Sequence, residues 1–248
     1  MKYESILKEI RRNPGKAFAE KAFITEIASE KYMEGGRRKM ELACIDEKQQ
    51  IYQWRVKNEE GEDYYFPYMN TTRIAKTETY VRSIGHVIVP KNAPDGTIVV
   101  TGGMNGCALQ VNILDDENLI FMHDQDAEAI QNPDSRDWFI HGQSFGASFS
   151  ADDLIKPDRI LSRVGPRNYM GLGDIHYRYF FDKLQKQNPE KMLYMAYYAF
   201  YVKVQGIWKL YMSLAGSLTD CKDGHIEYVK GEGVYLPNIH CVTSFEIR

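Results

Sequence analysis

The chain has 248 residues, of which 44% are hydrophobic and 26% are charged, and its formal net charge is −3. This length and composition are typical of one large globular domain with a substantial core. The slightly acidic balance argues against a dedicated nucleic-acid binder, because such proteins concentrate Lys and Arg.

Residues 1–36 are predicted to form an N-terminal helical segment. Apolar residues recur at helical spacing over residues 3–12 and 16–33, and the glycines at 35 and 36 end the second helix. From residue 37 the period shortens to two, which predicts a hairpin from strands 39–47 and 51–58. Further short strands are expected at 62–70, 77–83 and 84–90, followed by a turn at 91–96 that contains Pro, Asp and Gly.

The second half alternates strands with one long irregular region. Residues 125–173 contain several glycines and prolines and predict a loop, and a helix is expected at 174–187. The tyrosine-rich segment 191–216 predicts two long buried strands joined at Gln205 and Gly206, and residues 225–248 predict one or two more. We therefore expect an α+β fold, in which a β-sandwich-like core with flanking helices occupies residues 37–248 and forms one compact unit with residues 1–36.

The cysteine pattern and the hydropathy bear on location. The four cysteines show no disulfide-framework spacing and fit a reducing compartment (Cys44, Cys107, Cys221 and Cys241). Residues 1–16 lack the apolar core of a secretory signal, and the longest apolar stretch, 192–202, is too short to span a bilayer. We expect a cytoplasmic, monomeric protein, or one secreted or injected into the cytosol of another cell.

The segment TGGMNGC, residues 101–107, places a cysteine after a glycine-rich turn, and a predicted hairpin follows it. Alternation puts Cys107 on one face of the first arm and His123 on one face of the second. If both apolar faces point at the core, Leu109 lies opposite His123 and Cys107 is the diagonal neighbour of His123. Diagonal Cβ atoms lie roughly 7–8 Å apart, within reach of a thiol–imidazole contact. A shift of one residue in this register would separate the pair.

A thiol beside an imidazole can act as a nucleophile, because the imidazole accepts the thiol proton. A third group must then orient the imidazole, and Asp124, Asp126 and the Thr101 hydroxyl are the nearby candidates. The backbone amides of Gly106 and Cys107, with the Asn105 side chain, could stabilise an oxyanion. The simpler alternative is that Cys107 is an inert core residue.

The order TGGMNGC, strand, turn, strand, His123 resembles the Cys-His glutamine deamidases. This group includes the cytotoxic necrotizing factor catalytic domain, the Burkholderia lethal factor and the chemotaxis deamidases. Their turn has the form SGC or GSC where this chain has NGC, and the resemblance covers residues 97–127. It implies a cofactor-independent, metal-free thiol hydrolase in which Cys107 is the nucleophile, His123 the general base and acid, and Thr101 the orienting group.

The resemblance also implies that the substrate is a protein whose glutamine becomes glutamate, and the bacterial toxins and effectors of the group point to a host regulatory protein. Two alternatives stay open: another thiol hydrolase or acyl transferase, of the cysteine peptidase or transglutaminase kind, and a non-catalytic interaction protein. A zinc site is the other arrangement considered, from Cys221, His225, His240 and Cys241, but adjacent strand residues point to opposite faces and suit tetrahedral ligation poorly. His141 could line a pocket mouth or be a solvated loop residue.

Overall fold

The computed structural model describes most of the chain, and every structural statement below refers to the described residues. These are residues 3–25, 35–48, 50–67, 69–73, 80–104, 106–124, 156–169, 186, 189, 192–219, 221–222, 225–226 and 233–247. Within them, no helix is long and apolar enough to cross a membrane.

The N-terminal segment differs from its prediction in its second half. Helices α1 (Glu4–Arg12) and α2 (Pro14–Glu20) form as expected, and Asn13 caps α2 by accepting a hydrogen bond from the Lys16 amide at 3.3 Å. The predicted helix 16–33 is wrong at residues Ala22–Thr25, which form strand β1, and its remaining part, 26–33, lies outside the described residues. All four β1 residues are buried and pair in parallel with β3, so burial of both faces outweighs the local helical spacing.

Eight strands form the larger sheet, in the order β1-β3-β2-β4-β7-β11-β12-β15. The predicted hairpin is confirmed as β2 (Gly36–Asp46) and β3 (Ile51–Lys57), and the predicted tyrosine-rich pair as β11 (Met192–Val204) and β12 (Ile207–Thr219). The remaining members are β4 (Asp63–Phe66), β7 (Ile98–Met104) and β15 (Gly233–Glu246). A separate two-stranded ribbon joins β13 (Cys221–Lys222) to β14 (His225–Ile226).

Five strands form the second sheet, in the order β10-β8-β9-β6-β5. Its members are β5 (Met69–Arg73), β6 (Tyr80–Pro90), β8 (Ala108–Ile113), β9 (Asn118–Asp124) and β10 (Ile160–Val164). The two short strands predicted at 77–90 are one continuous strand over Tyr80–Pro90. Strand β10 lies inside the region predicted to be irregular, where pairing with β8 supplies the order that local sequence does not.

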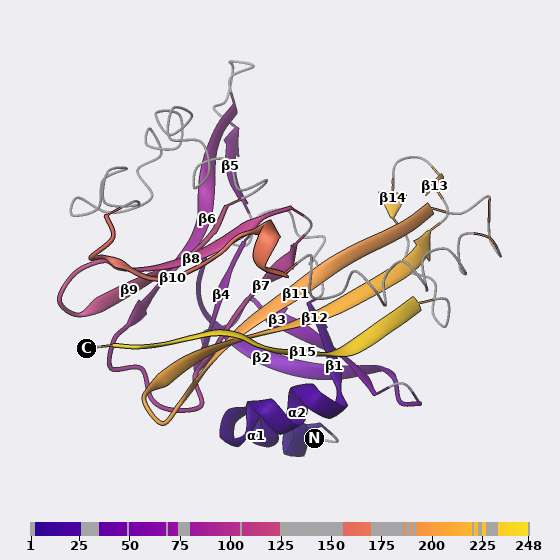
Figure 1. Cartoon of the computed structure of the whole chain (residues 1–248), viewed down its shortest axis with the longest axis horizontal. Coiled ribbons are helices and arrows are strands. Elements are labelled where there is room, and N and C mark those ends of the chain that lie inside the picture. Colours follow the sequence, from indigo (N-terminus) through magenta and orange to yellow (C-terminus); the bar gives the residue numbers. More distant parts are fainter. Residues whose placement is uncertain are drawn as a thin grey trace.

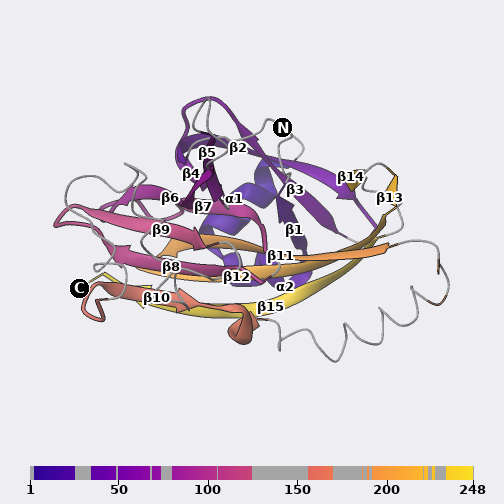
Figure 2. The same ribbon diagram turned by 90° about the horizontal axis from the view of Figure 1, so that it is seen from above.

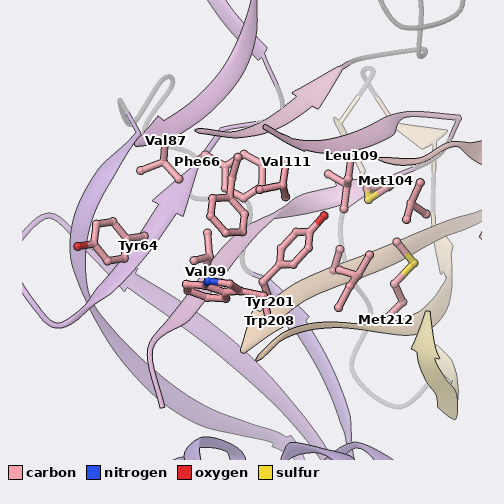
Figure 3. Close-up of a cluster of buried hydrophobic side chains, with 14 of the residues drawn as sticks. Tyr64, Phe66, Val87, Val99, Met104, Leu109, Val111, Tyr201, Trp208 and Met212 are labelled. Carbon is pink, nitrogen blue, oxygen red and sulfur yellow. The ribbon is translucent and has the colours of Figure 1, made fainter. Parts of the chain in front are cut away.

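The eight-stranded sheet separates two buried cores, which gives the molecule three layers. Alternate residues of β7 and β11 face opposite sides: Val99 and Tyr201 face the five-stranded sheet, whereas Val100 and Phe200 face the helices. Figure 1 shows α1 and α2 together beside the eight-stranded sheet. Figure 3 shows the other core, the sandwich interior, and labels Phe66, Val111 and Tyr201 among its side chains. The expected α+β fold with a sandwich-like core is therefore confirmed.

Candidate functional site

The hairpin that follows Cys107 has the register that was required to bring Cys107 and His123 together. Strands β8 and β9 run side by side (Figure 2), with Ile113 opposite Leu119 and Leu109 opposite His123. Cys107 immediately precedes β8 and belongs to the same buried cluster as Leu109. The predicted register of the hairpin is therefore confirmed, and it puts Leu109, which shares a buried cluster with Cys107, directly opposite His123.

Strand β7 brings Thr101 to the same interior through a bulge. Tyr198 pairs with Gly103 and Phe200 pairs with Val100, so Thr101 and Gly102 together lie opposite a single residue of β11. The extra residue shifts the alternation, which lets both Val99 and Met104 pack in the sandwich interior although they differ in parity.

The structure explains why two positions of TGGMNGC are glycine. A Cβ on Gly103 would approach Ala196 Cβ and the Tyr198 ring at 3.1 Å, which is tighter than ordinary van der Waals contact. Gly106 has φ +94°, a conformation that residues with a Cβ rarely adopt. The glycines thus allow β7 to pack closely on β11 and allow the chain to turn into Cys107.

A hydrogen bond between Thr101 and His123 joins the two sheets across the interior. Thr101 Oγ1 lies 2.8 Å from His123 Nδ1 and donates to the Phe66 carbonyl at 2.9 Å. A hydroxyl has one proton, and here that proton goes to Phe66. Thr101 must therefore accept from Nδ1–H, which leaves the lone pair of neutral His123 on Nε2.

The surroundings of His123 keep its imidazole neutral. The residue is fully buried, and burial lowers the pKa of His123 to about 3. The Phe66 ring lies edge-on to the imidazole, with centroids 6.4 Å apart. An imidazole with its lone pair on Nε2 is in the protonation state that a general base requires, but a pKa this far below neutrality makes it a weak base. A thiolate formed beside the buried imidazole would have to stabilise its protonated form.

Cys107 itself lies just below the surface. It is 6% exposed, and the Tyr169 hydroxyl donates to its carbonyl at 2.8 Å. Sequence reasoning missed Tyr169 and the Phe66 carbonyl as parts of the site, because neither has a local signal near TGGMNGC. A thiol recessed in this way is more accessible to a narrow side chain than to a main-chain bond.

The other candidate residues separate into two groups. Asp124 follows His123 along β9 and pairs with Ala108, so its side chain points to the opposite face of the sheet and does not orient the imidazole. Asn105, Asp126 and His141 lie outside the described residues, as do the side chains of the proposed zinc ligands (Cys221, His225, His240 and Cys241). Among the side chains that are described, no group of three or more His, Cys, Asp or Glu could hold a metal ion.

Searches found no family model and no curated protein that matches the chain. The assignment of a function therefore depends on the geometry of the site and on the resemblance of its sequence motif.

Proposed function

We propose that the chain is a protein-glutamine deamidase with Cys107 as nucleophile, His123 as general base and acid, and Thr101 as orienting group. The observation that supports this most is the hydrogen bond from His123 Nδ1 to Thr101, on the same interior face as Cys107. It fulfils the requirement that a third group fix the tautomer of the base.

The reaction has two steps. The Cys107 sulfur attacks the carboxamide carbon of a glutamine while its proton passes to His123 Nε2, and the oxyanion forms beside the Cys107 amide, because the Gly106 amide already donates to the Tyr169 hydroxyl. The protonated His123 then donates to the nitrogen, and ammonia leaves a thioester. Water, deprotonated by His123, attacks the thioester carbon, the carbon–sulfur bond breaks, and the products are glutamate and the thiol.

The burial of Cys107 favours a side-chain substrate over a backbone peptide bond. The glutamine carboxamide stands at the end of a flexible two-carbon arm, which can reach a cysteine residue that is 6% exposed. A main-chain bond in a folded protein could reach the same depth only if a length of its backbone entered the site. The burial of Cys107 therefore favours deamidation over proteolysis. The transferase alternative differs only in the acceptor, an amine in place of water.

The resemblance also indicates what the modification would do to its target protein. Conversion of glutamine to glutamate adds a negative charge to the target, so one event can disrupt a partner's interface. We propose a cytosolic protein as the substrate, in the protein's own cell or in a host cell that receives it as a toxin or effector, with no cofactor or metal.

The test is the release of ammonia when the protein is incubated with a cell extract depleted of free glutamine. We expect release by the wild type and none by Cys107→Ser, because the serine hydroxyl is a far weaker nucleophile at neutral pH. Cys44→Ser is the matched control, since Cys44 lies in β2, away from the hairpin, and should keep full activity.

Three other outcomes would contradict deamidation. Backbone cleavage that requires Cys107 would indicate a peptidase, and incorporation of a labelled primary amine into glutamine in preference to water would indicate a transglutaminase. Equal ammonia release by the wild type and Cys107→Ser would indicate a protein without catalysis at this site.

A further inference from the structure

Tyr169 reaches Cys107 from a separate part of the chain. Strand β10 pairs with β8 up to Val164 opposite Leu109, and a helical turn at 166–169 follows. The turn is closed by two hydrogen bonds between Gly165 and Asn168, each 2.9 Å long. This arrangement brings Tyr169 to the point where Cys107 enters β8.

The Tyr169 side chain is anchored in both sheets. It is fully buried and ends the helical turn that follows β10 of the five-stranded sheet. Its ring packs edge-on against Tyr197 of β11, in the eight-stranded sheet, with centroids 4.8 Å apart. The hydroxyl donates to the Cys107 carbonyl at 2.8 Å. A donor held on two sides in this way has little freedom to move, so it fixes the peptide that it binds.

The Tyr169 hydroxyl keeps its proton at neutral pH. Burial raises the pKa of Tyr169 well above its ordinary value, and the nearby Cys107 raises this pKa further. Loss of the proton would place a phenolate beside a developing thiolate, which charge repulsion opposes. Tyr169 is thus suited to hold the backbone and is unsuited to transfer a proton.

We propose that Tyr169 is a positioning residue for Cys107, holding the carbonyl of the nucleophile so that the thiol stays directed at His123. The inference rests on the proposed function, because it concerns the geometry of the proposed nucleophile. Without the hydroxyl, the Cys107 carbonyl loses a buried hydrogen-bond partner, and the turn at Gly106 loses a restraint.

The test compares the rate at which iodoacetamide labels Cys107 in the wild type and in Tyr169→Phe, by peptide mapping. If His123 accepts the thiol proton during attack, the wild-type rate changes little between pH 6 and pH 8. In Tyr169→Phe we expect labelling to be about tenfold slower than in the wild type at pH 7. We also expect the rate to fall about tenfold for each unit by which the pH is lowered, as for an unassisted thiol.

The control is Tyr201→Phe, which removes a buried hydroxyl from the same core, where the phenol lies beside Ser162. It should keep the wild-type rate and pH profile. Asn168→Ala is a second variant. Asn168 is exposed, and its replacement removes the hydrogen bond to the Gly165 amide and so loosens the turn that carries Tyr169, without changing Cys107 itself. It should slow labelling about threefold, which keeps the inference testable if Tyr169→Phe does not fold.

The outcomes separate the two proposals. If wild-type Cys107 reacts faster than Cys44 but both Tyr169→Phe and Asn168→Ala match the wild type in rate and pH profile, the positioning role is wrong and the deamidase proposal stands. If wild-type Cys107 reacts no faster than Cys44, the proposed function is overturned and the positioning role with it.

Discussion

Thr101 determines which nitrogen of His123 carries the proton. Its hydroxyl proton is donated to the Phe66 carbonyl, so its oxygen must accept from Nδ1–H of the imidazole. One side chain thereby satisfies two buried groups and leaves Nε2 as the base. A change at Thr101 should therefore affect catalysis through the tautomer of His123.

Thr101→Val replaces the hydroxyl with a methyl group of nearly the same size. We expect ammonia release to fall at least a hundredfold, because Nδ1 then has no acceptor and the imidazole can adopt the other tautomer. Thr101→Ser keeps the hydroxyl and should retain activity within about fivefold. Equal activity of the Val and Ser variants, measured as initial rates at matched folded concentration, would contradict the orienting role.

The burial of His123 also predicts how stability depends on pH. Its pKa is about 3 in the folded protein and 6.5 when exposed, so the unfolded chain takes up the proton first as pH falls. The contribution of His123 to the free energy of unfolding is complete above pH 6.5. Below that pH it is lost by about 1.4 kcal/mol per pH unit, down to pH 3.

The measurement for this prediction is urea unfolding of the wild type and His123→Asn at several pH values. From pH 6 to pH 4.5 the wild type should lose about 2 kcal/mol more than the variant. The comparison cancels the effect on stability of the carboxylates, because these titrate in both proteins. Parallel stability curves would show that His123 is not held neutral by burial.

At the scale of elements, helix α1 is joined to the eight-stranded sheet by an ion pair between half-buried Arg11 and buried Asp63. Arg11 donates to both carboxylate oxygens of Asp63, at 2.9 and 2.6 Å, and to the Gly96 carbonyl. Asp63 also accepts from the Ile98 amide at 3.0 Å, at the start of β7. The pair therefore connects α1 to the strand that carries Thr101.

Arg11→Ala should destabilise the protein by about 3 kcal/mol, because it leaves the Asp63 carboxylate buried without its cation. Arg12→Ala is the matched control: Arg12 is the next residue on the helix and is exposed, so its loss should change stability by less than about 0.5 kcal/mol. Equal free energies of unfolding for the two variants, from urea titration, would show that the ion pair does not hold α1.

At the scale of the whole molecule, the sequence predicted what depends on local alternation. The β8–β9 register followed from period-two patterning and a short turn, and the β11–β12 pair followed from its apolar run and Gln205–Gly206. Strand β1 could not be predicted, because its apolar residues fit a helix or a buried strand equally well, and only the pairing with β3 decides between them.

The candidate site was predictable in part for the same reason. Cys107 immediately precedes β8 and His123 lies in β9 of the same hairpin, so their relation is local. The Thr101 contact crosses between two sheets and was indicated by the resemblance, whereas spacing alone left Asp124 and Asp126 as alternatives. Tyr169 lies 62 residues from Cys107 and depends on β10, which pairs with β8 inside a segment predicted to be irregular.

The central claim is that Cys107 hydrolyses the side chain of a glutamine. In the most direct measurement, the wild type and Cys107→Ser are each incubated with a cell extract in water enriched in heavy oxygen. The proteins of the extract are then analysed by peptide mapping. We predict that the wild type alone converts a specific glutamine to glutamate with one heavy oxygen incorporated from water. Conversion that is equal in the Cys107→Ser sample, or the absence of any such site while Cys107 labels no faster than Cys44, would contradict the claim.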